Sequence, residues 1–261
     1  MDSRRVLAIL EYDGTDFEGF QIQRRGRTVQ GELERVLERV TGERVRIVGG
    51  GRTDSGVHAL GQGAHFDTTW KHPLDALQRA LNAELPRDLA VRSIIEVDAR
   101  FSARRSAKSR VYRYTILNRP VRSPLLSRYT LLVTEPLDSA AMNRAAHVLV
   151  GVHDFRSFGT APRGTNTVRQ TYSARVERSD EDRILISLEA NAFLYRMVRR
   201  IVGTLLWVGK GEMSLEGFQE VIAGKRRAGD AAGPQGLALV AIKYDLTTEP
   251  GTIIGVKNED I

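Results

Sequence analysis

The sequence predicts an α+β fold, in which helices cover one face of a sheet. Apolar residues recur at helical spacing in several segments, and short apolar runs of strand length separate those segments. The chain has 261 residues, of which 41% are hydrophobic and 27% charged, and these proportions are usual for a folded globular protein. That length is enough for one large domain or two of ordinary size, each with its own core.

The N-terminal half is predicted to contain two helices and four strands. Thr28 is a candidate N-cap for the first helix, Gly42 follows the end of that helix, and Pro86 follows the second helix. The expected elements are strand 6–11, helix 28–40, strand 45–48, strand 62–68, helix 74–85 and strand 89–97. Their order, β-α-β-β-α-β, is that of the split βαβ or ferredoxin-like arrangement.

The C-terminal half repeats this order loosely. Residues 100–110 are polar and basic and are expected to connect the halves, so the predicted domains are 1–105 and 106–261. The expected elements are strand 111–117, helix 139–150 with Asp138 as N-cap, strands 168–177 and 184–190, helices 193–208 and 215–222, and strand 237–244. The tail after Thr247 is expected to fray. The chain is therefore predicted to consist of two related α+β halves.

Charge and residue usage narrow the classes of function. Lys and Arg number 39 against 32 Asp and Glu, and this excess favours a polyanionic partner such as nucleic acid. The absence of cysteine excludes disulfides, thiolate catalysis and zinc–thiolate sites. The five histidines lack the spacing of metal ligands, so no metal is expected, and His153 and Asp154 are expected to begin a loop.

The N-terminus carries no sign of a secretion signal. Its apolar run, Val6 to Leu10, is too short for one, and Glu11 follows at once. No run in the chain approaches the roughly 20 apolar residues of a membrane span. We expect a cytoplasmic protein.

A glycine-rich segment, residues 49–58, carries one carboxylate, Asp54. Glycine allows unusual backbone angles and a close approach of a ligand, and an ionised carboxylate on such a loop suits covalent catalysis. Arg52 could hold that carboxylate or bind a phosphate. Other interpretations stay open: an ordinary turn, or a phosphate cradle, although the Gly-Lys-Ser/Thr ending of a P-loop is absent. His58 is interpreted as structural.

Seven segments, taken together and in this order, resemble the TruA family of tRNA pseudouridine synthases. Any one of them is a weak signal, but the set runs from residue 12 to residue 244 and is specific. The segments are Tyr12–Gln21, Thr28–Glu34, Gly51–Ala59, Lys108–Tyr114, Gly151–Phe155 with Phe158, Asn191–Arg199, and Gly236–Leu237 with Leu239 and Tyr244.

This resemblance implies an enzyme that isomerises uridine to pseudouridine at positions 38, 39 and 40 of the tRNA anticodon stem-loop, without a cofactor. It implies that Asp54 is the nucleophile, that Tyr112 stacks on the target base and that Arg199 pairs with Asp54. Attack on the ribose, attack on the base and removal of a ribose proton all stay open for Asp54. The resemblance also implies a homodimer, joined and mainly antiparallel sheets, and a basic cleft between the halves.

Two basic clusters are expected to contact the tRNA backbone. A uridine inside a stem must be flipped out, at a cost of a few kcal/mol that phosphate contacts would offset. The candidates are Arg24, Arg25, Arg27, Arg104, Arg105, Lys108 and Arg110. Two rival functions remain: a non-catalytic RNA-binding or RNA-folding protein, which would not need Asp54, and a phosphotransferase that uses the glycine loop.

Overall fold

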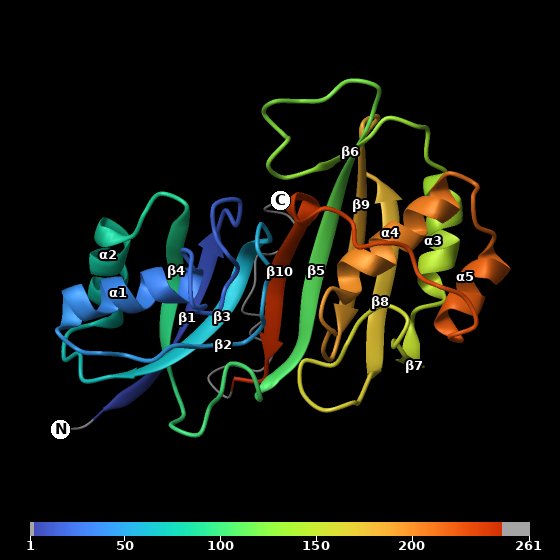
Figure 1. Cartoon of the computed structure of the whole chain (residues 1–261). Helices are drawn as coiled ribbons and strands as arrows, with labels where there is room; N and C mark the ends of the chain where they lie inside the picture. Colours follow the sequence, from blue (N-terminus) through green and yellow to red (C-terminus); the bar gives the residue numbers. More distant parts are fainter. Residues whose placement is uncertain (1–2, 247–261) are drawn as a thin grey trace. The chain divides into compact units, whose positions relative to one another are not determined.

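A computed structural model describes residues 3–246 of the chain (Figure 1). These residues divide into two compact units, of which the first comprises residues 3–110 and 239–246 and the second Val111–Ala238. The predicted domains, 1–105 and 106–261, assign the last strand to the second half. The division into folding domains stays a prediction, and the tail after Thr247 lies outside the described residues.

The helices and strands that the sequence predicts occur in the predicted order, and the structure adds two short strands, β6 (residues 131–133) and β7 (residues 151–154). The helices are α1 Val29–Thr41, α2 Leu74–Glu84, α3 Ser139–His147, α4 Met197–Gly209 and α5 Leu215–Ile222, with a 3₁₀ turn at Pro234–Gly236. The strands are β1 Arg4–Tyr12, β2 Val48–Gly49, β3 His58–Thr68, β4 Leu89–Val97, β5 Ala107–Asn118, β6 Leu131–Val133, β7 Gly151–Asp154, β8 Val168–Arg178, β9 Arg183–Ala190 and β10 Leu237–Tyr244.

In the first unit, β1 is a central strand that pairs antiparallel with both β3 and β4. The short β2 also pairs antiparallel with β3, and β10 follows β3 in the sheet. Helices α1 and α2 lie together on one side of these strands (Figure 1). This strand order and these directions are those of the ferredoxin-like arrangement, so the predicted α+β class is confirmed for this half.

Local sequence signals explain where α1 begins and ends. The Thr28 hydroxyl accepts a hydrogen bond from Gly31 N at 3.2 Å, and this satisfies an amide that has no partner within the helix. Gly42 ends the helix with φ of 74°, a left-handed conformation that glycine adopts without steric cost. Leu33 and Leu37 are fully buried and anchor the apolar face of the helix.

In the second unit, the strand order is β5-β9-β8-β7, and β6 pairs in parallel with β5. Helix α3 packs on β8, and α4 and α5 pack on α3, so the three helices form a group beside β8 and β9 (Figure 1). Along the chain, the series β5-α3-β8-β9-α4-β10 repeats the β-α-β-β-α-β order of the first half. Both halves are thus α+β, and their pairings are mainly antiparallel.

Three predicted elements are shorter in the structure. The helix expected at 139–150 ends at His147. In the other two, side chains or a loop bind the backbone. The strand expected at 45–48 shrinks to Val48–Gly49, since Ile47 N donates to Glu34 at 3.0 Å and Ile47 O accepts from Gln30 at 3.1 Å. The helix expected from Phe193 begins at Met197. Tyr195 N donates instead to Thr160 O at 3.0 Å, in an isolated bridge outside the helix.

Two segments predicted as connections are strands. Residues 107–110, expected to link the halves, form the beginning of β5. His153 and Asp154, expected to begin a loop, belong to β7, where they pair with Arg169 and Val168 of β8. Both segments are polar, so their strand character comes from a neighbouring strand and not from an apolar pattern.

Among the described residues, no helix is both long and apolar enough to cross a membrane.

Candidate active site

The loop that carries Asp54 connects β2 to β3 and is held by the segment that follows β1. Phe20 N donates to Thr53 O at 3.2 Å, and Gly56 N donates to Phe17 O at 3.3 Å. The buried Thr53 hydroxyl is also hydrogen-bonded to the Tyr12 hydroxyl at 2.8 Å. The residues on either side of Asp54 are therefore fixed to the first strand and its loop.

Two glycines make this close packing possible. A Cβ on Gly14 would lie 2.0 Å from Val57 O, and one on Gly19 would lie 2.6 Å from Thr53 O. Gly19 also has φ of 87°, which favours glycine. His58 is buried, and its Nδ1 accepts a hydrogen bond from Gly14 N at 3.0 Å, so this contact helps to hold the two loops together.

Further contacts fix the start of the Asp54 loop. The Gln62 side chain, on β3, accepts from Gly51 N at 3.1 Å and donates to Gly51 O at 2.7 Å. Arg110 donates through Nη2 to Gly50 O at 3.0 Å and to Arg104 O at 2.8 Å. Neither Gln62 nor the backbone role of Arg110 is signalled by the sequence, because both act on residues distant along the chain.

Asp54 itself is half-buried, between the buried Thr53 and the exposed Ser55. Its carbonyl accepts a hydrogen bond from Val57 N at 3.2 Å, which closes a tight turn. Arg52 is exposed on the same loop. A carboxylate on a backbone fixed at these points is preorganised for nucleophilic attack or for proton abstraction.

The two tyrosines of β5 differ in their surroundings. Tyr112 is 7% exposed, and its ring meets that of Phe193 edge to face, with 5.0 Å between the ring centres. Tyr114 is fully buried and donates to Gly233 O at 2.7 Å. Burial raises the pKa of Tyr114, and the positive charge of Arg199 opposes that rise in part. The sequence predicts Phe193 as part of the apolar stripe of a helix, but Phe193 precedes α4, and its contact with Tyr112 emerges only from the fold.

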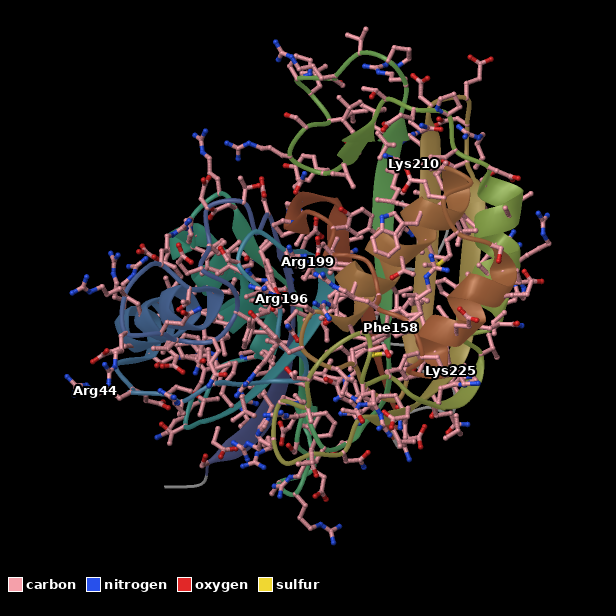
Figure 2. All side chains as sticks on the ribbon, turned by 45° about the vertical axis from the view of Figure 1, so that its right-hand side comes forward. Arg44, Phe158, Arg196, Arg199, Lys210 and Lys225 are labelled. Atoms are coloured by element: carbon pink, nitrogen blue, oxygen red, sulfur yellow. The ribbon has the colours of Figure 1, made fainter. Side chains whose placement is uncertain are left out.

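Arg199 lies in the first turn of α4 and is half-buried. Its Nε donates to Ala232 O at 2.6 Å, and Ala232 N donates to Arg199 O at 3.0 Å. This anchor uses one of the five guanidinium N–H groups and so orients the side chain. Figure 2 shows Arg199 and Arg196 near the beginning of α4, whereas Lys210 follows its other end.

The four predicted site residues fall two to each unit. Asp54 and Arg52 belong to the first unit, and Tyr112 and Arg199 belong to the second. The pairing of Asp54 with Arg199, and the basic cleft predicted around them, stay predictions.

The basic residues before α1 have different surroundings. Arg24 and Arg25 are exposed. Arg27 instead forms a bidentate pair with Asp88, at 2.6 and 2.8 Å, and its guanidinium lies 4.2 Å from the centre of the Phe17 ring. The contacts of Arg27 thus support a structural role, whereas the side chains of Arg24 and Arg25 lie at the surface.

The second basic cluster, residues 104–110, also contains both exposed side chains and side chains that bind groups within the protein. Arg104 and Arg105 are exposed. Lys108 pairs with Asp245 at 2.9 Å, and Arg110 holds the backbone carbonyls named above. Within residues 3–246, no group of three or more histidine and acidic side chains could hold a metal ion.

Comparison with known proteins identifies the family of the chain. Residues 8–104 and 145–245 match the family described as tRNA pseudouridine synthase. A tRNA pseudouridine synthase A from Chloroflexus aurantiacus is 49% identical over 247 residues, which cover 92% of this chain and 89% of that protein. The protein of the same name from Brevibacillus brevis is 45% identical over 244 residues, which cover 92% of this chain and 100% of that protein. The chain therefore belongs to the tRNA pseudouridine synthase family.

A solved structure of an archaeal box H/ACA Nop10–Cbf5 complex is a remote match, with a TM-score of 0.37 and 12% identity. It covers 77% of this chain and 44% of that one. The family assignment rests on the sequence relatives.

Proposed function

We propose that this protein isomerises uridine to pseudouridine at positions 38, 39 and 40 of the tRNA anticodon stem-loop, with Asp54 as its nucleophile. The family and the names of its relatives support the reaction. The structural observation that carries the proposal is the fixed loop around Asp54, because a nucleophile must be held in position against a bulky substrate.

The reaction rearranges bonds within one nucleotide. The bond between ribose C1′ and base N1 breaks, the base turns, and a bond forms between C1′ and C5. C5 loses a proton and N1 gains one, so atoms and electrons balance without an oxidant, a reductant or a second substrate. Asp54 begins the reaction by attack on ribose C1′, by attack on base C6, or by removal of the 2′ proton.

Tyr112 and Arg199 complete the proposed site. The Tyr112 ring stacks on the target uracil, and such stacking contributes about 1–3 kcal/mol, enough to keep the loosened base from escaping. Its hydroxyl is a candidate to help remove the C5 proton, by passing its own proton on as it takes up that one. In the proposed site, the Arg199 guanidinium pairs with the Asp54 carboxylate, and its contact with Ala232 sets the direction of the guanidinium.

Exposed arginines are the proposed contacts with the tRNA backbone. Arg24, Arg25, Arg104 and Arg105 lie at the surface of the first unit, and Arg52 lies on the nucleophile loop. We also propose that the protein acts as a cytoplasmic homodimer. The family resemblance supports the dimer, and the substrate, tRNA, supports the compartment.

The test is the release of tritium from tRNA labelled at uridine C5. Wild-type protein should release tritium, and Asp54→Asn should lower the rate at least about a thousandfold, since it removes the nucleophile. Ser55→Ala is the matched control, because Ser55 is the exposed neighbour in the same loop, and it should stay within about twofold.

Release at the wild-type rate by Asp54→Asn would reject the role of Asp54. Tight tRNA binding without any release by wild-type protein would favour the non-catalytic RNA-binding alternative. Mg²⁺-dependent ATP turnover would favour a phosphotransferase.

A further inference from the structure

Arg196 has a backbone conformation that arginine rarely adopts. Its φ is 59° and its ψ is 11°, and it is the one non-glycine residue with positive φ among residues 3–246. The other positive-φ positions of that range are all glycines. A large side chain in this conformation is under strain, and such strain concentrates at functional positions.

The surrounding chain imposes this conformation. Tyr195 is tied to Thr160 by a backbone bridge, and a Cβ on Gly159 would lie 2.5 Å from Tyr195 O, so the loop is packed closely against this point. Immediately afterwards, the Arg196 carbonyl accepts from Arg200 N at 3.0 Å in the first turn of α4. The chain must therefore change direction at residue 196, and it does so through the left-handed region.

The three arginines at the start of α4 have different partners. Arg199 Nε donates to Ala232 O, and Arg200 Nη1 donates to Ser157 O at 3.3 Å. Arg196 is exposed, and its guanidinium lies over the Tyr195 ring, 4.9 Å from the ring centre. Tyr195 is itself 50% exposed. No carboxylate pairs with Arg196 among the described residues, and residues 190–211 contain no acidic residue at all.

We propose that Arg196, supported on the Tyr195 ring, binds a phosphate of the tRNA backbone and contributes to substrate affinity. A guanidinium stacked on an aromatic ring keeps its edge N–H groups directed outward, and that edge matches two oxygens of a phosphate. Figure 2 shows Arg196 close to Arg199, which is three residues further along the chain, so a phosphate bound there belongs to RNA near the proposed site. This inference rests on the proposed function.

The comparison of Arg196→Gly with Arg196→Ala distinguishes the effect of losing the side chain from the effect of the backbone strain. Arg196→Gly relieves the strain and removes the guanidinium, whereas Arg196→Ala removes the guanidinium and keeps the strain. Both variants should raise the KM for tRNA about tenfold, since a charge-assisted hydrogen bond is lost, and leave kcat within about twofold. Only Arg196→Gly should match or exceed the wild-type Tm.

Two further variants and a salt series complete the experiment. Arg196→Lys keeps the charge without the planar edge and should lie between Arg196→Ala and wild type. Arg144→Ala, an exposed arginine of α3, is the matched control and should keep the wild-type KM. In direct tRNA binding, Arg196→Gly should reduce the slope of log affinity against log salt by about one.

A wild-type KM and salt slope for Arg196→Gly would overturn the inference. A raised KM for Arg196→Ala alone would also overturn it, because the effect would then come from the backbone. Both outcomes require that the wild-type protein is active in the same assay. Failure of wild-type protein to release tritium would instead reject the proposed function.

Discussion

At the residue scale, several side chains act by holding the backbone in place. Tyr12, Gln62 and His58 are buried, and each fixes a loop or strand around Asp54 through hydrogen bonds. The position of Asp54 therefore depends on side chains to which the proposed reaction assigns no chemical step. Tyr112 and Tyr114 lie on the same strand, but Tyr112 has a proposed role in the reaction, whereas Tyr114 is buried and binds Gly233 O.

Replacing each tyrosine of β5 by phenylalanine should separate these roles. Tyr112→Phe keeps the ring that meets Phe193 and removes the hydroxyl, so kcat should fall about a hundredfold if that hydroxyl accepts the C5 proton, with little change in tRNA affinity. Tyr114→Phe loses the hydrogen bond to Gly233 O and should cost about 1 kcal/mol of unfolding free energy with kcat unchanged.

Denaturant unfolding and single-turnover tritium release measure the two effects. Equal loss of kcat in both variants would contradict the assignment of the proton acceptor to Tyr112.

Tyr12 should make the protein sensitive to alkali. Burial raises the pKa of Tyr12 to about 12, against the opposing hydrogen bonds from Thr53 and Gln62. The unfolded chain then loses its proton near pH 10 while the folded chain keeps it, so stability falls as pH rises from about 10 to about 12. The slope from this group reaches at most about 1.4 kcal/mol per pH unit.

Denaturant unfolding at a series of alkaline pH values gives that slope. Tyr12→Phe should reduce it, although the variant starts from lower stability at neutral pH because the bond to Thr53 is lost. An unchanged slope would show that Tyr12 does not contribute to the alkaline loss.

At the scale of elements, the first strand and its loop act as a support for the nucleophile loop. The support depends on close backbone contact, and glycines at the contact points allow it. Helix caps such as Thr28 fix where the surrounding helices begin.

Gly14→Ala should therefore damage both stability and catalysis. The new Cβ would lie 2.0 Å from Val57 O, so the Asp54 loop must shift, with a loss of about 2–3 kcal/mol and a fall of about a hundredfold in kcat. Gly42→Ala is the control, because Gly42 has φ of 74° but nothing within 4 Å of an added Cβ. That variant should lose about 1 kcal/mol and keep full activity.

Urea unfolding and tritium release are measured on both variants. Full activity in Gly14→Ala would contradict the close support that we infer for the Asp54 loop.

At the scale of the whole molecule, the net charge of +7 favours tRNA, but the arginines do not contribute equally. Exposed arginines can release counterions from the RNA, whereas an arginine paired within the protein is already neutralised. The side chains before α1 offer a direct comparison of the two kinds.

The double variant Arg24→Ala/Arg25→Ala should reduce the magnitude of the slope of log affinity against log salt concentration by about two, with an unchanged Tm. Arg27→Ala should leave that slope unchanged and lower the stability by about 1–3 kcal/mol, since it breaks the bidentate pair with Asp88. Filter binding over a range of salt concentrations and thermal unfolding give both quantities. A large change of slope in Arg27→Ala would contradict its structural role.

The sequence by itself determined the features that depend on near neighbours in the chain. Caps, turn glycines and apolar periodicity placed β4 and α5 at the residues where the structure has them, because these signals act within one or two turns. The ordered motifs determined the family and marked Asp54, since residue type and order along the chain are all that such a comparison needs.

Only the tertiary structure decided the features that depend on distant partners. Contacts with Gln30 and Glu34 shortened the strand before Val48, and the bridge to Thr160 delayed the start of α4. Arg27 and Arg110 look like RNA ligands in the sequence, yet each binds groups about 60 residues away. Such contacts follow from the path of the folded backbone, which local sequence patterns do not specify.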